Sequence, residues 1–150
     1  MESDNQKIMN RMKKTLLIVD DNDVILKLLK AYFERNYHVH IATDGVEAIS
    51  LLFEGIMPDL IICDLNMDNI NGYELVKHLS TSRLYKNIPV IILSGSPERD
   101  SKPLEEAFVI ETIVNKPFDP MSLSNIVKET LLKNDYRAIN SKYPILRRLN

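Results

Sequence analysis

Three short apolar runs, each ending in a polar residue, constrain the fold of this chain more than any other feature. They span Thr15–Asp20, Asp59–Asp64 and Pro89–Ser94. A strand with one solvated face alternates apolar and polar side chains, whereas a strand that is buried on both faces is continuously apolar. The runs therefore predict parallel strands with helices on both sides. Weaker strand patterns occur at Tyr37–Ala42 and Thr112–Asn115.

Helical patterns separate these strands. Apolar residues recur at the spacing of one helical face in two stretches: Val24, Ile25, Leu28, Leu29, Tyr32 and Phe33, and then Val46, Ile49, Leu52 and Phe53. A third helix is expected from Tyr73, and two more where proline follows a capping residue, at Ser96 and Asp119. Five strands alternating with five helices predict a doubly wound α/β fold, with a parallel sheet of order 2-1-3-4-5.

Length and composition indicate one globular domain. The chain has 150 residues, 45% of them hydrophobic and 27% charged, as in ordinary folded domains. We expect a polar leader at 1–14, the domain at 15–132 and a basic tail at 133–150. No apolar run is long enough to span a membrane, and the leader lacks a signal-peptide core, so we expect a cytoplasmic protein with no membrane partner. Cys63 is the only cysteine, which excludes an intrachain disulfide.

The net charge of −2 is unevenly distributed along the chain. The leader and the tail both carry an excess of lysine and arginine, so the body between them is strongly acidic. An acidic body suits a cation site and argues against direct binding of nucleic acid, whose phosphates it would repel.

Polar residues end the predicted strands at one edge of the sheet. Asp20 and Asp21 follow the first strand, Asp64 ends the third, Ser94 ends the fourth and Lys116 follows the fifth. Ligands of doubly wound sheets bind at these carboxyl ends, where the strand order reverses. Three neighbouring carboxylates repel one another unless a cation neutralises them, and Mg²⁺ prefers such oxygen ligands. A carboxylate nucleophile with a metal, a lysine and a hydroxyl would form a site for an aspartyl-phosphate.

Five motifs around these residues together resemble the receiver domain of bacterial response regulators, over roughly 15–132. They are LLIVDDN around Asp20 and Asp21, LIICDLNM around Asp64, NGYEL at Asn71–Leu75, VIILSG around Ser94, and NKPF around Lys116. The resemblance implies a flavodoxin-like sheet with Asp64 as the phosphoacceptor, Ser94 as the switch hydroxyl and Lys116 as the phosphoryl-binding lysine. It also implies a cis bond between Lys116 and Pro117. The Mg²⁺ ligands would be Asp20, Asp21, Asp64 and the backbone carbonyl of Asn66.

The resemblance also implies partners. A histidine kinase or a histidine phosphotransfer protein would donate the phosphoryl group. The chain would be a signalling protein and not an enzyme, because it would assist only its own phosphorylation and dephosphorylation. The tail at 133–150 is too short for an output domain, so we expect a single-domain regulator of the chemotaxis-regulator type. Its output would be protein contact, onward phosphotransfer or formation of a homodimer, with the downstream protein unknown.

Three positions depart from the family pattern. Asp68 stands where a proline is usual, which leaves the chemistry intact. Ile113 occupies the position of an aromatic residue that turns inward when the switch hydroxyl moves toward the phosphate. Pro103 is expected to interrupt the helix that begins near Ser96. We therefore expect intact phosphorylation chemistry with an unusual readout.

Two other functions fit parts of the sequence. In a haloacid-dehalogenase-like phosphatase, Asp21 and Asp23 would form the nucleophile pair. Ser94 and Lys116 would supply the later motifs of that enzyme, but no acidic pair follows Lys116 on a strand end, and the chain is short for it. The third hypothesis is a phosphorylation-independent interaction module on the same scaffold, which Ile113 makes worth testing.

Overall fold

Five parallel strands form one sheet in the computed structural model, which describes residues 3–100 and 110–144. The strands are β1 (Thr15–Val19), β2 (His38–Ala42), β3 (Leu60–Asp64), β4 (Val90–Ser94) and β5 (Ile110–Asn115). Their order is β2-β1-β3-β4-β5, as the alternation of strands and helices predicted. The three continuous apolar runs are the central strands, and β3 and β4 are buried at every position.

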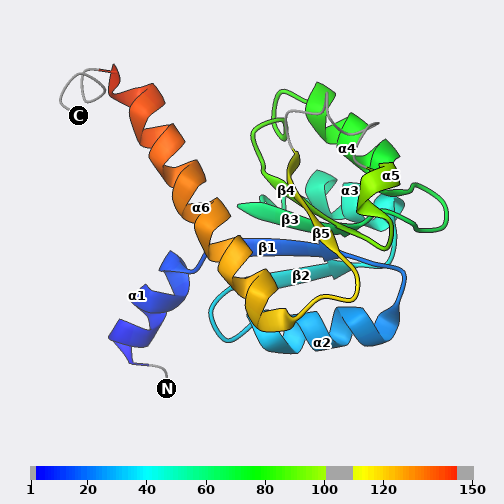
Figure 1. The fold of residues 1–150 in the computed structure, drawn as a ribbon. Coiled ribbons are helices and arrows are strands. Elements are labelled where there is room, and N and C mark those ends of the chain that lie inside the picture. The colour runs from blue at the N-terminus through cyan, green and yellow to red at the C-terminus, as the bar shows by residue number, and fades with distance from the viewer. Residues whose placement is uncertain (1–2, 101–109, 145–150) are drawn as a thin grey trace.

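Helices cover both faces of this sheet. The described residues contain α1 (Asp4–Met12), α2 (Asp23–Phe33), α3 (Gly45–Phe53), α4 (Gly72–Thr81), α5 (Pro97–Asp100) and α6 (Pro120–Lys142). α2 and α6 lie against one face, and α3 and α4 lie against the other (Figure 1). Among the described helices, none has the length and apolar character needed to cross a membrane.

Each face of the sheet has its own hydrophobic core. Successive side chains of a strand point to opposite faces, so Leu16 and Ile18 of β1 pack with Phe33 of α2 and the buried side of α6. Leu17 of the same strand packs with Leu75 of α4 and the buried side of α3. A central strand with two cores to fill has no position for a polar side chain before its carboxyl end. This requirement explains the continuous apolar runs.

Short polar side chains start the helices. In each of four helices, the capping side chain accepts a hydrogen bond from a backbone N–H of the first turn, which otherwise has no partner; the caps are Asn22, Asp44, Asn71 and Asp119. Pro120 follows Asp119 at the first helical position, as predicted. Two of these caps, Asn22 and Asn71, lie in the loops that follow β1 and β3. They therefore fix the chain close to the carboxyl edge of the sheet.

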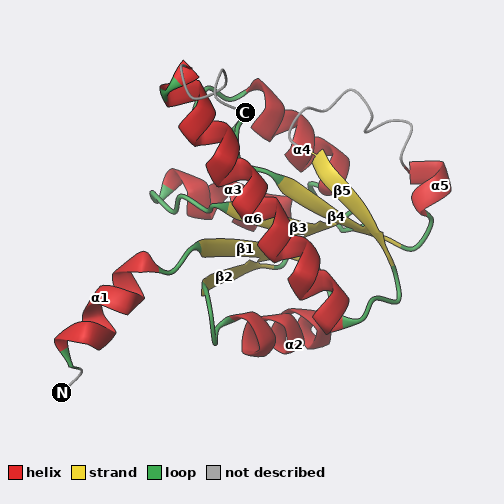
Figure 2. Cartoon of the chain, turned by 60° about the vertical axis from the view of Figure 1, so that its left-hand side comes forward, coloured by secondary structure: helices red, strands yellow, loops and turns green. Residues whose placement is uncertain are grey.

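The described residues contain six helices and not the five that were expected, because part of the polar leader folds as α1. The side chain of Ser3 caps this helix by accepting a hydrogen bond from the backbone N–H of Gln6. Figure 2 shows α1 extending away from the start of β1, apart from both helical layers.

The last helix continues into the segment that was expected to be a basic tail. α6 continues through Lys142, past the expected domain boundary at 132. Glu111 of β5 forms ion pairs with Lys133 and Arg137 at 2.7 and 3.2 Å, and these contacts hold the extension against the sheet. Pro103, which was expected to interrupt the helix after β4, lies outside the described residues; the described part of that helix is α5.

Candidate functional site

The carboxyl ends of β1 and β3 bring the predicted acidic residues together. These strands are neighbours, with Val19 opposite Cys63, so Asp20 and Asp64 are the next residues on each. The backbone N–H of Asp20 donates to the carbonyl of Ala42 at 3.1 Å, which extends the pairing with β2 by one residue. Both carboxylates are therefore fixed by the sheet and not by a mobile loop.

Three carboxylates cluster at this edge. Asp20, Asp21 and Asp64 each offer one oxygen, and these oxygens all lie within 4.8 Å of one another. Asp20 and Asp64 are buried, with 0% and 5% of their surface exposed, whereas Asp21 is exposed. The oxygen-only donor set and the excess negative charge fit a hard divalent cation such as Mg²⁺, which takes few carboxylates and keeps several waters.

Asp20 lies in an environment that disfavours its charge. Burial, followed by the nearby charge of Asp64, raises the pKa of Asp20 above its usual value. Two groups partly oppose this shift: the backbone N–H of Asn22, which donates to Oδ1 at 2.8 Å, and the ammonium group of Lys116. A bound cation would favour the ionised form further.

Lys116 crosses the sheet edge to reach the acidic cluster. Its Nζ lies 2.9 Å from Oδ1 of Asp64 and 3.5 Å from Oδ2 of Asp20. Burial lowers the pKa of Lys116, but the hydrogen bond to Asp64 and the two negative charges more than compensate, so the pKa is raised overall. The backbone N–H of Lys116 donates to the carbonyl of Ser94 at 2.7 Å, and the bond to Pro117 is cis, as the resemblance implied.

Ser94 is buried at the end of β4, one residue beyond the position opposite Asp64. Its hydroxyl was expected to serve the phosphoryl group, but here it donates to Oδ2 of Asp100 in α5. The hydroxyl oxygen of Ser94 in turn accepts a hydrogen bond from the backbone N–H of Ser96 at 2.9 Å. Sequence reasoning missed Asp100, because it lies outside the five motifs and only the path of the chain after β4 brings it back to Ser94.

The start of α4 packs tightly against the end of β3. A Cβ atom at Gly72 would lie 2.8 Å from both the carbonyl oxygen of Asp64 and the Cα of Leu65, so only glycine fits there. Asn69 has a positive φ of 58°, and its side chain donates to Asp44 at 2.9 Å. Asn66 is exposed in the loop between β3 and α4, and the part of its backbone carbonyl in metal binding stays a prediction.

This geometry can be compared with known proteins. The family model for the response regulator receiver domain matches residues 16–128, which include all of these residues. The chain belongs to the response regulator receiver domain family. Receiver domains are signalling domains that interact with histidine kinases and bind Mg²⁺ in an acidic pocket, and the three aspartates provide an acidic pocket here.

Curated relatives of this receiver are longer proteins. It is 33% identical over 132 residues to the alkaline phosphatase synthesis transcriptional regulatory protein PhoP of Bacillus subtilis, covering 87% of this chain and 54% of that protein. It is 37% identical over 109 residues to the response regulator SaeR of Staphylococcus aureus, covering 72% of this chain and 46% of that protein. The chain thus spans about half the length of these curated relatives.

Solved structures share the fold. The signal receiver domain of a signal transduction histidine kinase from Syntrophus aciditrophicus is 31% identical, with a TM-score of 0.72 and coverage of 80% of this chain and 91% of that one. A CheY-like response regulator receiver domain protein from Methanospirillum hungatei is 26% identical, with a TM-score of 0.76 and coverage of 83% and 98%. The flavodoxin-like sheet of this receiver is therefore that of its family.

Two side chains near the receiver's site, Ile113 and Cys63, pack in the core on the α3 and α4 side of the sheet. Ile113 lies opposite Ile92 in the pairing of β4 with β5 and packs against the core on the α3 and α4 side. It is a partly buried aliphatic residue at the position where the family pattern has an aromatic residue. Cys63 is fully buried, and burial raises the pKa of its thiol, so it is a packing residue, as expected for an apolar strand.

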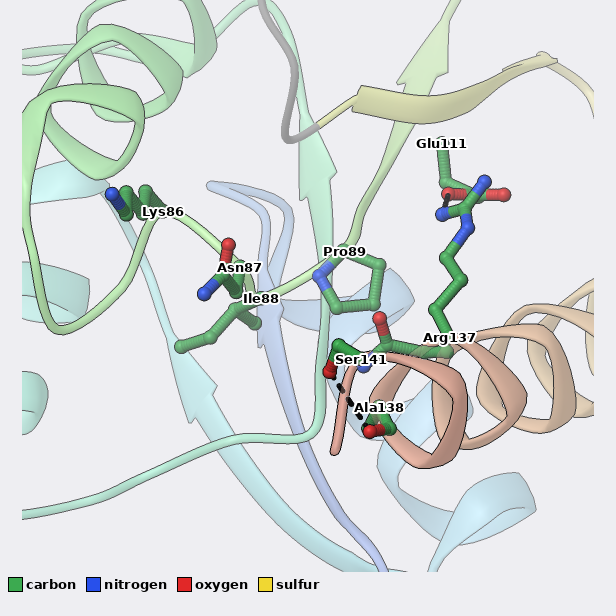
Figure 3. A pocket seen from close by; sticks show the side chains of 9 residues that line it. Lys86, Asn87, Ile88, Pro89, Glu111, Arg137, Ala138 and Ser141 are labelled. Atoms are coloured by element: carbon green, nitrogen blue, oxygen red, sulfur yellow. Dashed lines mark hydrogen bonds and ion pairs between the residues drawn. The ribbon is translucent and has the colours of Figure 1, made fainter. Parts of the chain in front are cut away.

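A pocket of about 460 Å³ lies at the opposite edge of the sheet, away from the aspartates. Its walls are the segment before β4, the start of β5 and the extension of α6 (Figure 3); the lining residues are Lys86, Asn87, Ile88, Pro89, Glu111, Asn134, Arg137, Ala138 and Ser141. Figure 3 shows Arg137 reaching from α6 toward Glu111. None of the predicted site residues lines this pocket.

Proposed function

We propose that this receiver is a phosphorylation switch in which Asp64 accepts a phosphoryl group from the phosphohistidine of a histidine kinase or a histidine phosphotransfer protein. The observation that carries the proposal is the contact of Lys116 with Asp64, at 2.9 Å, beside two further carboxylates. A carboxylate held at a strand end, next to a lysine and a potential cation site, has the groups that phosphoryl transfer requires.

The transfer is a displacement at phosphorus. A carboxylate oxygen of Asp64 attacks the phosphorus atom, and the P–O bond forms as the P–N bond to histidine breaks. The histidine nitrogen keeps the bonding electron pair. Lys116 already lies against this carboxylate, so a small movement of its ammonium group brings it to the incoming phosphoryl oxygens. Lys116 would therefore stabilise the charge that develops during transfer.

Four oxygen donors would hold Mg²⁺ at this site: the carboxylates of Asp20, Asp21 and Asp64 and the backbone carbonyl of Asn66. Bound Mg²⁺ would offset the charge of the phosphoryl oxygens and so let them approach an acidic cluster. Burial of Asp20 and exposure of Asp21 suggest different contributions from these two residues. The first would fix the position of the ion, and the second would face its solvent side.

Acetyl phosphate with Mg²⁺ tests the proposal directly. The wild-type protein should gain one phosphoryl group by intact mass, and Asp64→Asn should gain none. Asp68→Asn is the matched control, because it removes an exposed carboxylate from the same loop and should be labelled like wild type. Equal labelling of wild type and Asp64→Asn would overturn the assignment of Asp64.

The same variants separate this function from a phosphatase that uses Asp21 as its nucleophile. Turnover of a phosphate ester that survives Asp64→Asn but is lost in Asp21→Asn would favour the phosphatase. The position of Lys116 favours Asp64 as the phosphoacceptor, because the lysine contacts Asp64 at 2.9 Å and Asp20 at 3.5 Å.

We also propose that the output is contact with another protein or onward phosphotransfer. Phosphorylation adds charge beside Ser94 and Lys116 and shifts a two-state equilibrium of the receiver. Affinity capture with phosphorylated and unphosphorylated protein tests this output. A partner that binds wild type and Asp64→Asn equally well under phosphorylating conditions would favour a phosphorylation-independent interaction module instead.

A further inference from the structure

The hydroxyl of Ser94 already has a hydrogen-bond acceptor. It donates to Oδ2 of Asp100, and its oxygen accepts a hydrogen bond from the backbone N–H of Ser96. A hydroxyl has one proton to donate. Ser94 can therefore serve a phosphoryl oxygen on Asp64 only after it has left Asp100.

Asp100 is a strong and well-fixed acceptor. It is buried, with 3% of its surface exposed, and its other oxygen accepts hydrogen bonds from Nε of Arg99 at 3.3 Å and from the hydroxyl of Tyr73 at 3.4 Å. The hydrogen bond from Ser94 is the main cause that lowers the pKa of Asp100. The acceptor is thus a carboxylate ion, and hydrogen bonds to ions are about twice as strong as those between neutral groups.

We propose that Asp100 is a positioning residue that competes with the phosphoryl group for the Ser94 hydroxyl and so restrains phosphorylation of Asp64. This inference rests on the proposed phosphoacceptor function. In the unphosphorylated protein, Asp100 holds the hydroxyl on the side of α5. When Asp64 is phosphorylated, the hydroxyl transfers its hydrogen bond to the phosphoryl oxygens.

The exchange also provides a readout that does not require an aromatic residue at position 113. Asp100 ends α5, and Tyr73 lies in the first turn of α4. Among the described side-chain contacts, loss of the bond from Ser94 leaves the carboxylate of Asp100 with Tyr73 and Arg99, so this tie between the end of α5 and β4 is lost. Release of this contact would change the surface formed by α4 and α5 even though Ile113 cannot rotate like an aromatic ring.

The rate of labelling by acetyl phosphate in Mg²⁺ tests the proposal. Asp100→Asn removes the charged acceptor with little change in shape, and we expect the rate to rise on the order of tenfold, as loss of one charge-assisted hydrogen bond predicts. Glu129→Gln is the control, since it removes the same charge from an exposed position of α6, and it should label at the wild-type rate. Asp100→Ala should raise the rate in the same direction if Asp100→Asn folds poorly.

A double-mutant cycle shows whether Asp100 acts through Ser94. Ser94→Ala should label more slowly than wild type, and adding Asp100→Asn to it should change the rate less than about twofold, because no hydroxyl is left to release. Structural damage would slow labelling and would not speed it. Melting curves of each variant show whether its fold is intact.

Two results would overturn the inference while Asp64 remains the acceptor. One is an unchanged or slower rate in Asp100→Asn. The other is an equal gain in the presence and absence of the Ser94 hydroxyl. Labelling that persists in Asp64→Asn would instead overturn the phosphoacceptor function itself, so the two failures can be told apart.

Discussion

Lys116 and Asp64 form an ion pair although a strand lies between the two strands that they follow or end. Nζ of Lys116, just after β5, lies 2.9 Å from Oδ1 of Asp64 at the end of β3, although β4 lies between these strands in the sheet. The backbone N–H of Lys116 donates to Ser94 at the end of β4, which anchors the residue at that point. The long lysine side chain then reaches the acidic cluster from a fixed position.

This relationship predicts a large loss of phosphorylation in Lys116→Met. The substitution keeps most of the apolar stem but removes the only positive charge described at Asp64, so the labelling rate with acetyl phosphate should fall by about a hundredfold, as for loss of one preorganised donor. Lys77→Met, at an exposed position of α4, should keep the wild-type rate. A wild-type rate in Lys116→Met would exclude a part for this lysine in transfer.

Binding of Mg²⁺ should stabilise the fold through the three aspartates. A ligand that binds only the folded state raises the free energy of unfolding by about 1.4 kcal/mol at ten times its dissociation constant. The melting temperature of wild type should therefore rise with Mg²⁺, and that of Asp21→Asn should rise much less. Without Mg²⁺ the variant should melt no lower than wild type, because it has lost one of three repelling charges.

The control for this experiment is the neighbouring acidic residue on α2. Asp23→Asn removes an exposed carboxylate that pairs with Lys27 at 3.6 Å and lies outside the cluster. It should keep the full response to Mg²⁺. The cluster would lose its assignment as a cation site if Asp21→Asn and Asp23→Asn responded alike.

The close approach of the backbone at Gly72 predicts sensitivity to a single methyl group. In Gly72→Ala, the new Cβ would lie 2.8 Å from both the Asp64 carbonyl oxygen and the Cα of Leu65, and backbone atoms cannot easily move away. We expect a loss of about 1–3 kcal/mol of unfolding free energy in urea. Displacement of β3 should also slow phosphorylation of Asp64.

A second glycine at the same edge of the sheet provides the comparison. Gly95 follows Ser94, and a Cβ there would meet no atom within 4 Å. Gly95→Ala should change the unfolding free energy by less than about 0.5 kcal/mol. If both alanine variants were equally stable, the packing of the start of α4 against Asp64 would be looser than the structure indicates.

The sheet and the acidic cluster could be predicted from the sequence because local patterns determine them. A strand buried on both faces must be apolar throughout, so its first polar residue marks the carboxyl end. Asp64 at the end of β3 and Asp20 just after β1 are such residues, and the parallel register then brings them together. Lys116 was predicted differently, from the NKPF motif that follows the weaker strand pattern of β5, because β5 is only partly buried and contains polar residues.

The remainder of the site depends on contacts between distant segments. Asp100 meets Ser94 only because the chain turns back after β4, and no residue pattern near either one indicates that turn. The extension of α6 beyond 132 likewise contacts a distant segment, because Glu111 of β5 forms ion pairs with two of its residues. The helix in the leader was missed although Ser3 is a typical capping residue, because a polar segment carries little periodic signal.

The ion pairs between β5 and the extension of α6 predict a pH-dependent contribution to stability. Burial raises the pKa of Glu111, but the hydrogen bond and charge of Lys133, with the charge of Arg137, more than compensate, so the pKa is lowered overall. A lowered pKa in the folded state means that the stabilisation is complete above the pKa of the unfolded chain. It is lost as the pH falls through the folded-state pKa.

Glu111→Gln should therefore be less stable than wild type at pH 7, and the difference should shrink as the pH falls below about 4, where the unfolded chain takes up the proton. The expected loss at neutral pH is about 1 kcal/mol or less, because the lysine and arginine side chains are 57% and 56% exposed and water screens their charges. Urea unfolding at pH 7 and at a pH below about 4 measures this difference in stability.

Glu129→Gln is the control, because it removes an equal charge at an exposed position of α6. Its stability relative to wild type should change less between these two pH values. Equal pH dependence in the two variants would mean that the extension of α6 is not held to β5 through Glu111.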